Sequence, residues 1–265
     1  MPKSAPNSLL AVLRRTPALL LLASAVFFGV SYFTVRFPEV EGAFVGSYLS
    51  TLAIALPSFA GLWRYLGGRR AAAALVALGA YGFVIETTGT VTGFPYGEFF
   101  YGDSLGPKLA GHVPYILPVS YAPLVIGAFA ATAPAGRRDG SVLYWVLGTA
   151  LLLTLVDGVL DPGAAYLGFW VWPEGGLYYG VPLSNYLGWL FSSGLAAVVL
   201  LAAGRPRRVA HGPPVPGMLD SLVLAVAFWV GVALWAGMLV PVVLGAVLFV
   251  YLLRRRALLR AARVR

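Results

Sequence analysis

Long apolar segments recur along almost the whole chain and are separated by short segments that carry arginine. A helix that crosses a bilayer needs about 20 mainly apolar residues, because the hydrocarbon core is about 30 Å thick. With 59% hydrophobic and 11% charged residues, the chain has more hydrophobic side chains than the core of one soluble domain can bury. We therefore expect an all-α integral membrane protein, one polytopic domain of residues 1–265, with about eight transmembrane helices, seven being possible. The expected spans are 17–36, 43–63, 71–91, 112–133, 142–160, 184–203, 218–235 and 238–253.

The distribution of positive charge predicts how these helices are oriented. If both termini are cytoplasmic, every lysine and arginine except Arg36 and Lys108 falls in an expected cytoplasmic segment. Cytoplasmic loops of membrane proteins carry an excess of these residues. We therefore expect an even number of spans, with the last two joined through residues 235–237, in a multi-pass protein of the cell (cytoplasmic) membrane. The basic excess then indicates a lipid bilayer as the partner, and no nucleic acid.

Two loops on the non-cytoplasmic side, at about 92–111 and 161–183, are long and rich in glycine, proline, tyrosine and tryptophan. Long ordered loops tend to be functional. Pro162 is expected to end the fifth span just before the second of these loops.

Carboxyl groups inside the spans are the strongest functional signal. An ionisable side chain within a membrane is costly and is a functional candidate by default. Glu86 falls in the outer half of the third span, Asp157 in the same part of the fifth, and Asp161 follows at i+4, on one helix face if the helix continues. Asn185 begins the sixth span at the same depth. Eight of the ten acids are expected on this side as one cluster, namely Glu39, Glu41, Glu86, Glu98, Asp103, Asp157, Asp161 and Glu174.

A purely structural interpretation of these residues is also open. Asp157 and Asp161 could cap or pair with backbone groups at a helix end, and Glu86 could bond Thr90 or a neighbouring helix, because buried polar groups must be satisfied. Lys108 could be a counter-ion of the acids or an interfacial anchor. His112 is expected to head the fourth span, and the aromatic residues could form the belt that membrane proteins place at the interface.

The chemistry of this residue set suits isoprenoids. A carboxyl group in a poorly hydrated apolar site resists ionisation and can act as a general acid near neutral pH. Aromatic faces beside it can stabilise a developing cation. With no cysteine and two histidines, the chain has no thiolate ligands and little for a zinc or haem centre.

Several motifs in the middle of the chain, between about 80 and 190, resemble one family. They are Glu-Thr-x-Gly-x-x-Thr-Gly-x-Pro-Tyr-Gly (86–97), Gly-Pro (106–107), Asp-x-x-x-Asp-Pro (157–162), Trp-x-Trp (170–172) and Tyr-Gly-Val-Pro-x-x-Asn-Tyr-x-Gly-Trp (179–189). Together they are similar to the membrane carotenoid biosynthesis proteins of the carotenoid 1,2-hydratase type, including the bisanhydrobacterioruberin and γ-carotene 1',2'-hydratases.

The resemblance implies an enzyme, a hydro-lyase that adds water across the terminal isopropylidene (C1,C2) double bond of a ψ end group and needs no redox cofactor. Its expected partner is a carotenoid of the lycopene, γ-carotene or bisanhydrobacterioruberin class, together with other carotenoid biosynthesis enzymes. Glu86 or Asp157 is the expected acid, and Asp161 and Asn185 are expected to orient water or to hold the partner acid in its other protonation state. The expected substrate-binding residues are Thr90, Tyr96, His112, Trp170, Trp172, Tyr178, Tyr179 and Trp189.

Other classes remain as alternatives. A lycopene-type cyclase shares the protonation step and differs only in which nucleophile captures the cation. An intramembrane prenyltransferase would normally carry two aspartate-rich motifs for magnesium diphosphate, and only one Asp-x-x-x-Asp occurs here. A transporter would place its polar residues nearer the midplane, and a retinal protein needs a lysine in a late span, where residues 218–253 have none.

Overall fold

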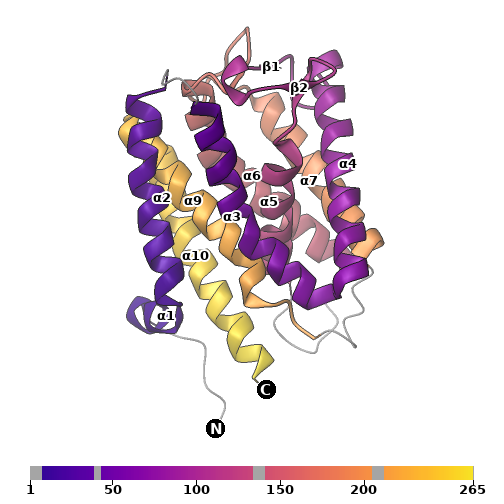
Figure 1. Cartoon of the computed structure of the whole chain (residues 1–265), viewed down its shortest axis with the longest axis vertical. Helices are drawn as coiled ribbons and strands as arrows, with labels where there is room; N and C mark the ends of the chain where they lie inside the picture. Colours follow the sequence, from indigo (N-terminus) through magenta and orange to yellow (C-terminus); the bar gives the residue numbers. More distant parts are fainter. Residues whose placement is uncertain (1–7, 39–42, 134–140, 205–211, 265) are drawn as a thin grey trace.

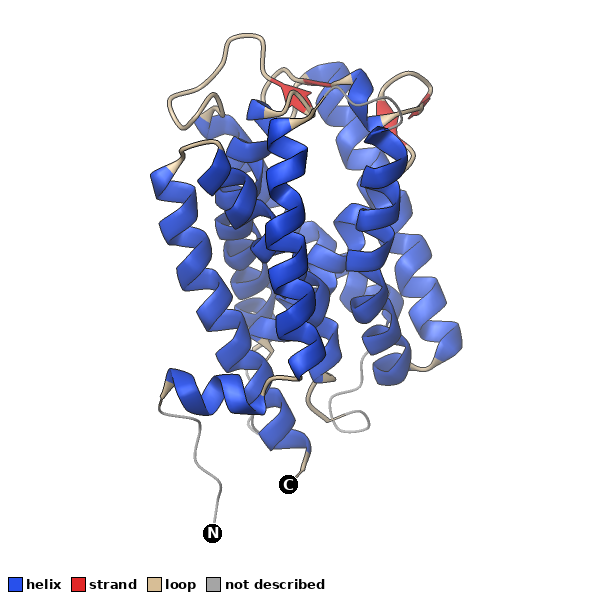
Figure 2. Cartoon of the chain, turned by 60° about the vertical axis from the view of Figure 1, so that its left-hand side comes forward, coloured by secondary structure: helices blue, strands red, loops and turns tan. Residues whose placement is uncertain are grey.

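The computed structural model describes residues 8–38, 43–133, 141–204 and 212–264. Within these ranges the chain is a bundle of long helices, with two short β-ribbons in the loops at one end (Figures 1 and 2). The helices are α1 (Leu9–Arg15), α2 (Ala18–Arg36), α3 (Ala43–Leu66), α4 (Gly68–Thr92), α5 (Leu117–Thr132), α6 (Val142–Tyr166), α7 (Leu183–Gly204), α9 (Asp220–Trp235) and α10 (Leu239–Arg263). Two single turns, η1 (Asp103–Leu105) and η2 (Pro216–Leu219), complete the helical elements of the described residues.

Each of the eight expected spans coincides with a helix, α2 to α7, α9 and α10. Six helices in the described part of the chain are long and apolar enough to cross a membrane, and α5 is a shorter apolar helix of 16 residues. The expected joint between the last two spans is also present, because α9 ends at Trp235 and Gly237 turns the chain with a φ of 76°. The expectation of an all-α membrane protein is confirmed.

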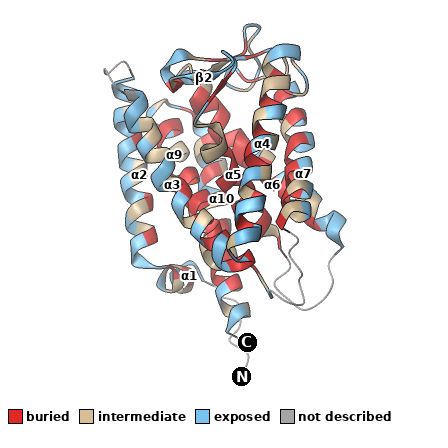
Figure 3. Cartoon of the chain, turned by 45° about the vertical axis from the view of Figure 1, so that its right-hand side comes forward, coloured by how far each residue is buried: buried red, intermediate tan, exposed pale blue. Residues whose placement is uncertain are grey.

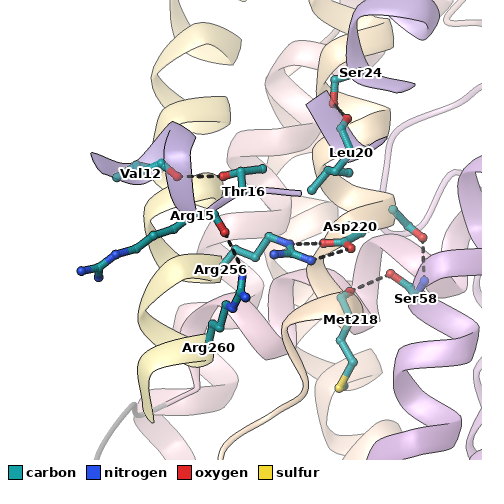
Figure 4. Close-up of polar contacts among 11 residues, drawn as sticks. Val12, Arg15, Thr16, Leu20, Ser24, Ser58, Met218, Asp220, Arg256 and Arg260 are labelled. Atoms are coloured by element: carbon teal, nitrogen blue, oxygen red, sulfur yellow. Dashed lines mark hydrogen bonds and ion pairs between the residues drawn. The ribbon is translucent and has the colours of Figure 1, made fainter. Parts of the chain in front are cut away.

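The bundle has two chemically different ends. One, the arginine end, carries α1, the turn between α3 and α4, and the last turns of α10; the other, the loop end, carries the β-ribbons (Figure 1). The described residues nearest the two termini meet at the arginine end, where Arg260 donates a hydrogen bond to the carbonyl oxygen of Arg15 at 3.1 Å (Figure 4). That this end faces the cytoplasm stays a prediction from the charge distribution.

A partly buried ion pair joins the helices at the arginine end. Arg256 on α10 donates two hydrogen bonds to the Asp220 carboxylate, at 2.6 and 3.0 Å, and the Ser58 hydroxyl of α3 donates to the carbonyl oxygen of Met218 at 2.6 Å (Figure 4). A bidentate arginine–carboxylate pair fixes geometry in two directions. These bonds therefore hold α3, α9 and α10 together between the arginine end and the cavity described in the next section.

The core of the bundle runs along α5, α6 and α9. Every residue of α5 from Tyr121 to Ala131 is buried, whereas α2 packs on α9 from outside and exposes most of its surface (Figure 3). A helix that is apolar on all sides is expected in such a central position or in lipid. The exposed apolar surface of the outer helices fits a lipid environment.

The prediction that Pro162 ends the fifth span is wrong, because α6 continues to Tyr166. Proline has no N–H and so leaves the carbonyl of residue i−4 without its helical partner. That carbonyl belongs to Gly158, and it accepts a hydrogen bond from the Tyr178 hydroxyl at 3.0 Å. A side chain from the following loop thus replaces the missing backbone hydrogen bond, and the helix can continue.

The expected start of the fourth span is also wrong. α5 begins at Leu117, and the residues before it form a hairpin of β2 (Lys108–Leu109) and β3 (Val113–Pro114). Ala110 and Gly111 have φ values of 48° and 81°, a left-handed turn that reverses the chain. His112 therefore lies exposed in a turn and not at the head of a helix.

A second ribbon ties the two expected functional loops together. β1 (Phe100–Tyr101) pairs antiparallel with β4 (Trp170–Val171), which sets Tyr101 opposite Trp170. The loops themselves span residues 93–116 and 167–182, compared with the expected 92–111 and 161–183. Glu39, Glu41 and Asp139 lie outside the described residues.

Candidate active site

A cavity of about 560 Å³ occupies the half of the bundle nearest the loop end. Its lining comes from α2 to α7, from α9 and from both loops, and most of it is apolar or aromatic. The carboxyl groups of Glu86 and Asp161 and the amide of Asn185 reach it from three different helices. An apolar cavity with a few convergent polar groups is the usual form of a binding site for a small organic molecule.

Glu86 lies on α4 and is 4% exposed. Its Oε2 accepts a hydrogen bond from the Tyr101 hydroxyl at 2.8 Å, and the Tyr96 hydroxyl also lies near this carboxyl group. Burial, and then the nearby Glu86 carboxyl group, raise the pKa of Tyr101 well above its ordinary value. The Tyr101 hydroxyl therefore keeps its proton and is the donor in this bond.

The loop position of Tyr101 is itself held from two sides. Its backbone pairs with Trp170 in the β1–β4 ribbon, and its carbonyl oxygen accepts a hydrogen bond from Lys108 Nζ at 2.6 Å. Lys108 also contacts Asp103 Oδ1 at 2.8 Å, and this contact lowers the pKa of the exposed Asp103 carboxyl group. Lys108 thus anchors the loop that carries Tyr101, and in the described structure its carboxylate partner is Asp103.

Asp157, Asp161 and Asn185 form a second polar group. The two aspartates stand one turn apart on α6, as their spacing predicts, and Asn185 lies in the first turn of α7; all three are 2% exposed. The Asn185 amide nitrogen donates to Asp157 Oδ2 at 3.0 Å and also to Asp161 Oδ2. Trp170 Nε1 donates to Asp161 Oδ1 at 3.1 Å. Because one nitrogen serves both aspartates, their carboxyl groups are close neighbours.

Two glycines of the sequence motifs make room for Tyr96. A Cβ atom on Gly89 of α4 would lie 2.8 Å from the Tyr96 ring, and one on Gly188 of α7 would lie 2.7 Å from the same ring and 2.6 Å from the Pro95 carbonyl oxygen. All three distances are shorter than non-bonded contacts of a carbon atom allow. Glycine at these two positions therefore lets the first loop insert Tyr96 between α4 and α7, beside Glu86.

The structure brings seven of the expected site residues to the cavity wall: Glu86, Tyr96, Asp161, Trp170, Trp172, Asn185 and Trp189. Asp157 lies behind that wall and reaches it only through Asn185 and Asp161. The Tyr178 hydroxyl donates a hydrogen bond to the Gly158 carbonyl. The hydroxyl of Tyr179, a residue that is 37% exposed, accepts a hydrogen bond from the Val240 amide at 3.4 Å. Neither tyrosine lines the cavity.

Thr90 and His112 lie elsewhere, in a second and more polar hollow of about 250 Å³ whose walls also include Asp103 and Lys108. The Thr90 hydroxyl bonds the Thr87 carbonyl of its own helix, so Glu86 bonds Tyr101 and not Thr90. Tyr101 lines both the hollow and the large cavity. The residue that bonds Glu86 therefore borders both spaces.

The expected single cluster of acids is smaller than predicted. Of its six members that the structure describes, Glu98, Asp103 and Glu174 are exposed, and Glu86, Asp157 and Asp161 gather inside the bundle. No group of three or more His, Cys, Asp or Glu side chains within the described ranges is placed to hold a metal ion.

Sequence reasoning missed several wall residues. Tyr101 lies four residues beyond the first motif (86–97), and its position after two phenylalanines gives no sign of a bond to Glu86. Tyr121, Phe169 and Trp229 also line the cavity. Trp229 lies inside a uniformly apolar span, where nothing in the sequence distinguishes a cavity residue from a lipid-facing one.

The fold and the site together define a polytopic helical membrane protein with buried carboxyl groups inside an apolar cavity. The chain belongs to the carotenoid biosynthesis protein family, whose model matches residues 42–252. It is 45% identical over 204 residues to the bisanhydrobacterioruberin hydratase of Haloarcula japonica, an alignment that covers 75% of this chain and 68% of that protein. The family resemblance of the motifs is thereby confirmed. No solved structure matches the chain.

Proposed function

We propose that this protein is a carotenoid hydratase that adds water to the C1,C2 double bond of a ψ end group and produces a tertiary alcohol. The observation that carries the proposal is the apolar cavity with Glu86 and Asp161 in its wall, in a chain that is 45% identical to a protein named bisanhydrobacterioruberin hydratase. An alkene is a weak base, so its hydration needs a strong, well-placed acid and a site that stabilises a cation.

The acid in this proposal is Asp161, supported by Asp157. Two carboxyl groups that share one amide nitrogen in a buried site repel each other when both are ionised. A single proton held between them removes this repulsion, as in other carboxyl pairs. Asp161 is the member that reaches the cavity. It therefore delivers the proton to C2, whereas the sequence favoured Glu86 or Asp157 for this step.

Aromatic side chains stabilise the resulting tertiary cation at C1. Trp170, Trp172 and Trp189 line the cavity together with Tyr96 and Tyr121. The faces of such rings are electron-rich and attract a cation, an interaction that is strongest where water is excluded. The wall that encloses the end group is thus also the wall that favours its protonated form.

Glu86 is the base that activates water. The Tyr101 hydroxyl donates to it, which stabilises the carboxylate. The polar hollow on the other side of Tyr101 supplies the water molecule. Water adds to C1 and gives a proton to Glu86, and that proton returns to the aspartate pair through further water molecules. One water is consumed and no electrons are exchanged, so the reaction is that of a hydro-lyase without a redox cofactor.

We place the reaction in the cell membrane, with both termini in the cytoplasm and the loop end on the opposite side. The arginine-rich end supports this orientation. The substrate belongs to the lycopene, γ-carotene or bisanhydrobacterioruberin class, and other carotenoid biosynthesis enzymes would supply it.

The test is turnover by the purified protein in liposomes that contain one carotenoid of this class and no ion gradient. Extracted pigment should gain the mass of one water molecule for each hydrated end. A product of unchanged mass but altered retention would identify a cyclase instead. Pigment that remains unaltered in every liposome would refute an enzymatic role on these substrates. Liposomes with the Glu86→Gln protein are the matched control.

A further inference from the structure

The cavity is too small for a whole carotenoid. Cavities of roughly 300–1,000 Å³ enclose ligands of drug size, and this one measures about 560 Å³. If the proposed function is correct, the end group occupies it and the long polyene must leave through an opening. The position of that opening decides whether the substrate arrives from the lipid or from water.

The lining shows where the cavity reaches the surface of the bundle. Besides the buried carboxyl groups it includes Val30 and Phe33 of α2, which are 40% and 60% exposed. Across from them, α3 contributes Ser47, Thr51 and Ile54. We call the opening between these two rows the portal, defined by Val30, Phe33, Thr34, Ser47, Thr51 and Ile54.

The packing of the helices explains why a portal exists at this position. α2 packs along α9, and α3 packs on α4, α5 and α9. In the part of the chain that the structure describes, α2 and α3 do not form a packed pair of this kind. They flank α9 as separate helices (Figure 1). Side chains from the two helices therefore border an open space that leads inward to the carboxyl groups.

The chemistry of the portal suits a hydrocarbon. Its residues are apolar or carry a single hydroxyl, and among the described lining residues of the whole cavity the ionisable acids are Glu86 and Asp161, both deeply buried. A charged residue along the path would disfavour a polyene. On the loop side, by contrast, the buried Phe99, Tyr101 and Leu105 cover the cavity. The route without charged side chains therefore runs sideways, between α2 and α3.

We propose that the carotenoid enters laterally from the bilayer through the portal between α2 and α3, so that its end group meets Asp161 and Glu86 while its polyene chain stays between these helices and the lipid. This inference rests on the proposed function, since it concerns the substrate of the same site. Water then arrives by a separate route, through the polar hollow beside Tyr101.

The natural absence of cysteine allows a direct test. The double variant Val30→Cys/Thr51→Cys is bridged by a bis-maleimide whose spacer contains a disulfide. We expect the bridge to lower turnover in carotenoid liposomes at least tenfold. Reduction cuts the bridge but leaves both added groups in place, and turnover should return. Recovery would show that the cross-link between α2 and α3, and not the bulk of the attached maleimide groups, blocks the substrate.

The matched control joins two helices away from the cavity. Ala150 on α6 and Gly194 on α7 are close, since a Cβ atom on Gly194 would lie 3.8 Å from that of Ala150, which suits a disulfide. Oxidised Ala150→Cys/Gly194→Cys should keep the turnover of its reduced form. A bridged portal variant with undiminished turnover would overturn the inference.

A second readout separates this inference from the proposed function. Carotenoid that remains bound to the purified protein is measured by its absorbance before and after bridging, whether or not it is hydrated. If the wild-type protein forms no hydrated product but bridging still abolishes pigment uptake, the hydratase proposal fails and the portal stands. If pigment uptake is the same with and without the bridge, the portal is refuted.

Discussion

The variant Asp161→Asn tests the proposed acid most directly. The change is isosteric and removes the transferable proton. It also has a calculable structural cost, because both Asp161 oxygens accept hydrogen bonds, Oδ1 from Trp170 and Oδ2 from Asn185. An amide has only one acceptor oxygen. Its NH₂ group must then face one of two N–H donors.

The expected magnitudes differ for stability and for turnover. One lost buried hydrogen bond costs about 1–3 kcal/mol of unfolding free energy. Loss of a general acid lowers turnover by about 10²–10⁴, which corresponds to about 2.7–5.4 kcal/mol of activation free energy. Asp157→Asn should disturb the structure less, because Asp157 Oδ1 accepts no hydrogen bond from the described residues, so an NH₂ group in its place breaks none. Its turnover should fall less than that of Asp161→Asn.

The assay is the initial rate of hydrated carotenoid formation in liposomes, with thermal unfolding of the same preparations. Trp170→Phe serves as the control for stability, since it removes the bond to Asp161 Oδ1 but leaves the carboxyl group. It should be destabilised about as much as Asp161→Asn and lose far less turnover, because phenylalanine keeps an aromatic face in the cavity wall. If Asp161→Asn turns over at the wild-type rate, Asp161 is not the acid and the assignment is refuted.

Three further results are expected. Glu86→Gln should keep the Tyr101 hydrogen bond through its amide oxygen yet lower turnover by about 10²–10⁴ as a lost general base; an unchanged initial rate would contradict the role of Glu86. Tyr178→Phe should cost about 1–3 kcal/mol, because it leaves a buried carbonyl unsatisfied, and adding Pro162→Ala should recover part of this loss by supplying the missing N–H; additive losses in the double-mutant cycle would argue against the explanation. Arg256→Met should destabilise the bundle by about 1–3 kcal/mol, since it leaves the partly buried Asp220 carboxylate without its partner, and thermal unfolding that matches the wild type would show that the pair is not needed.

The sequence located the candidate site in part. Glu86, Asp157, Asp161 and Asn185 were identified because an ionisable or amide group in an apolar span is conspicuous, and the i+4 spacing of the aspartates predicted their common face. Their division of roles was not readable in the same way. Only the structure shows that Asp161 reaches the cavity while Asp157 lies behind it, because that depends on the rotation of α6 against α7.

The aromatic residues show more clearly what the sequence could not predict about the site. Trp170, Trp172 and Tyr178 occur within nine residues of one loop and look alike in sequence. The first two line the cavity, whereas Tyr178 satisfies the carbonyl that Pro162 leaves free. The residue type alone does not distinguish a residue that lines the cavity from one that bonds a backbone carbonyl, since both roles need a large side chain with a polar tip.

What the sequence determined by itself is the set of spans, their helical form and the polar groups among them. Bilayer thickness and the cost of unpaired backbone in lipid leave a long apolar segment few other structures. The tertiary structure alone decided that Tyr101 meets Glu86, that two loops are tied by β1 and β4, and that α2 and α3 leave a portal. These features arise from contacts between segments far apart in the chain, and such contacts leave no local periodicity from which they could be read.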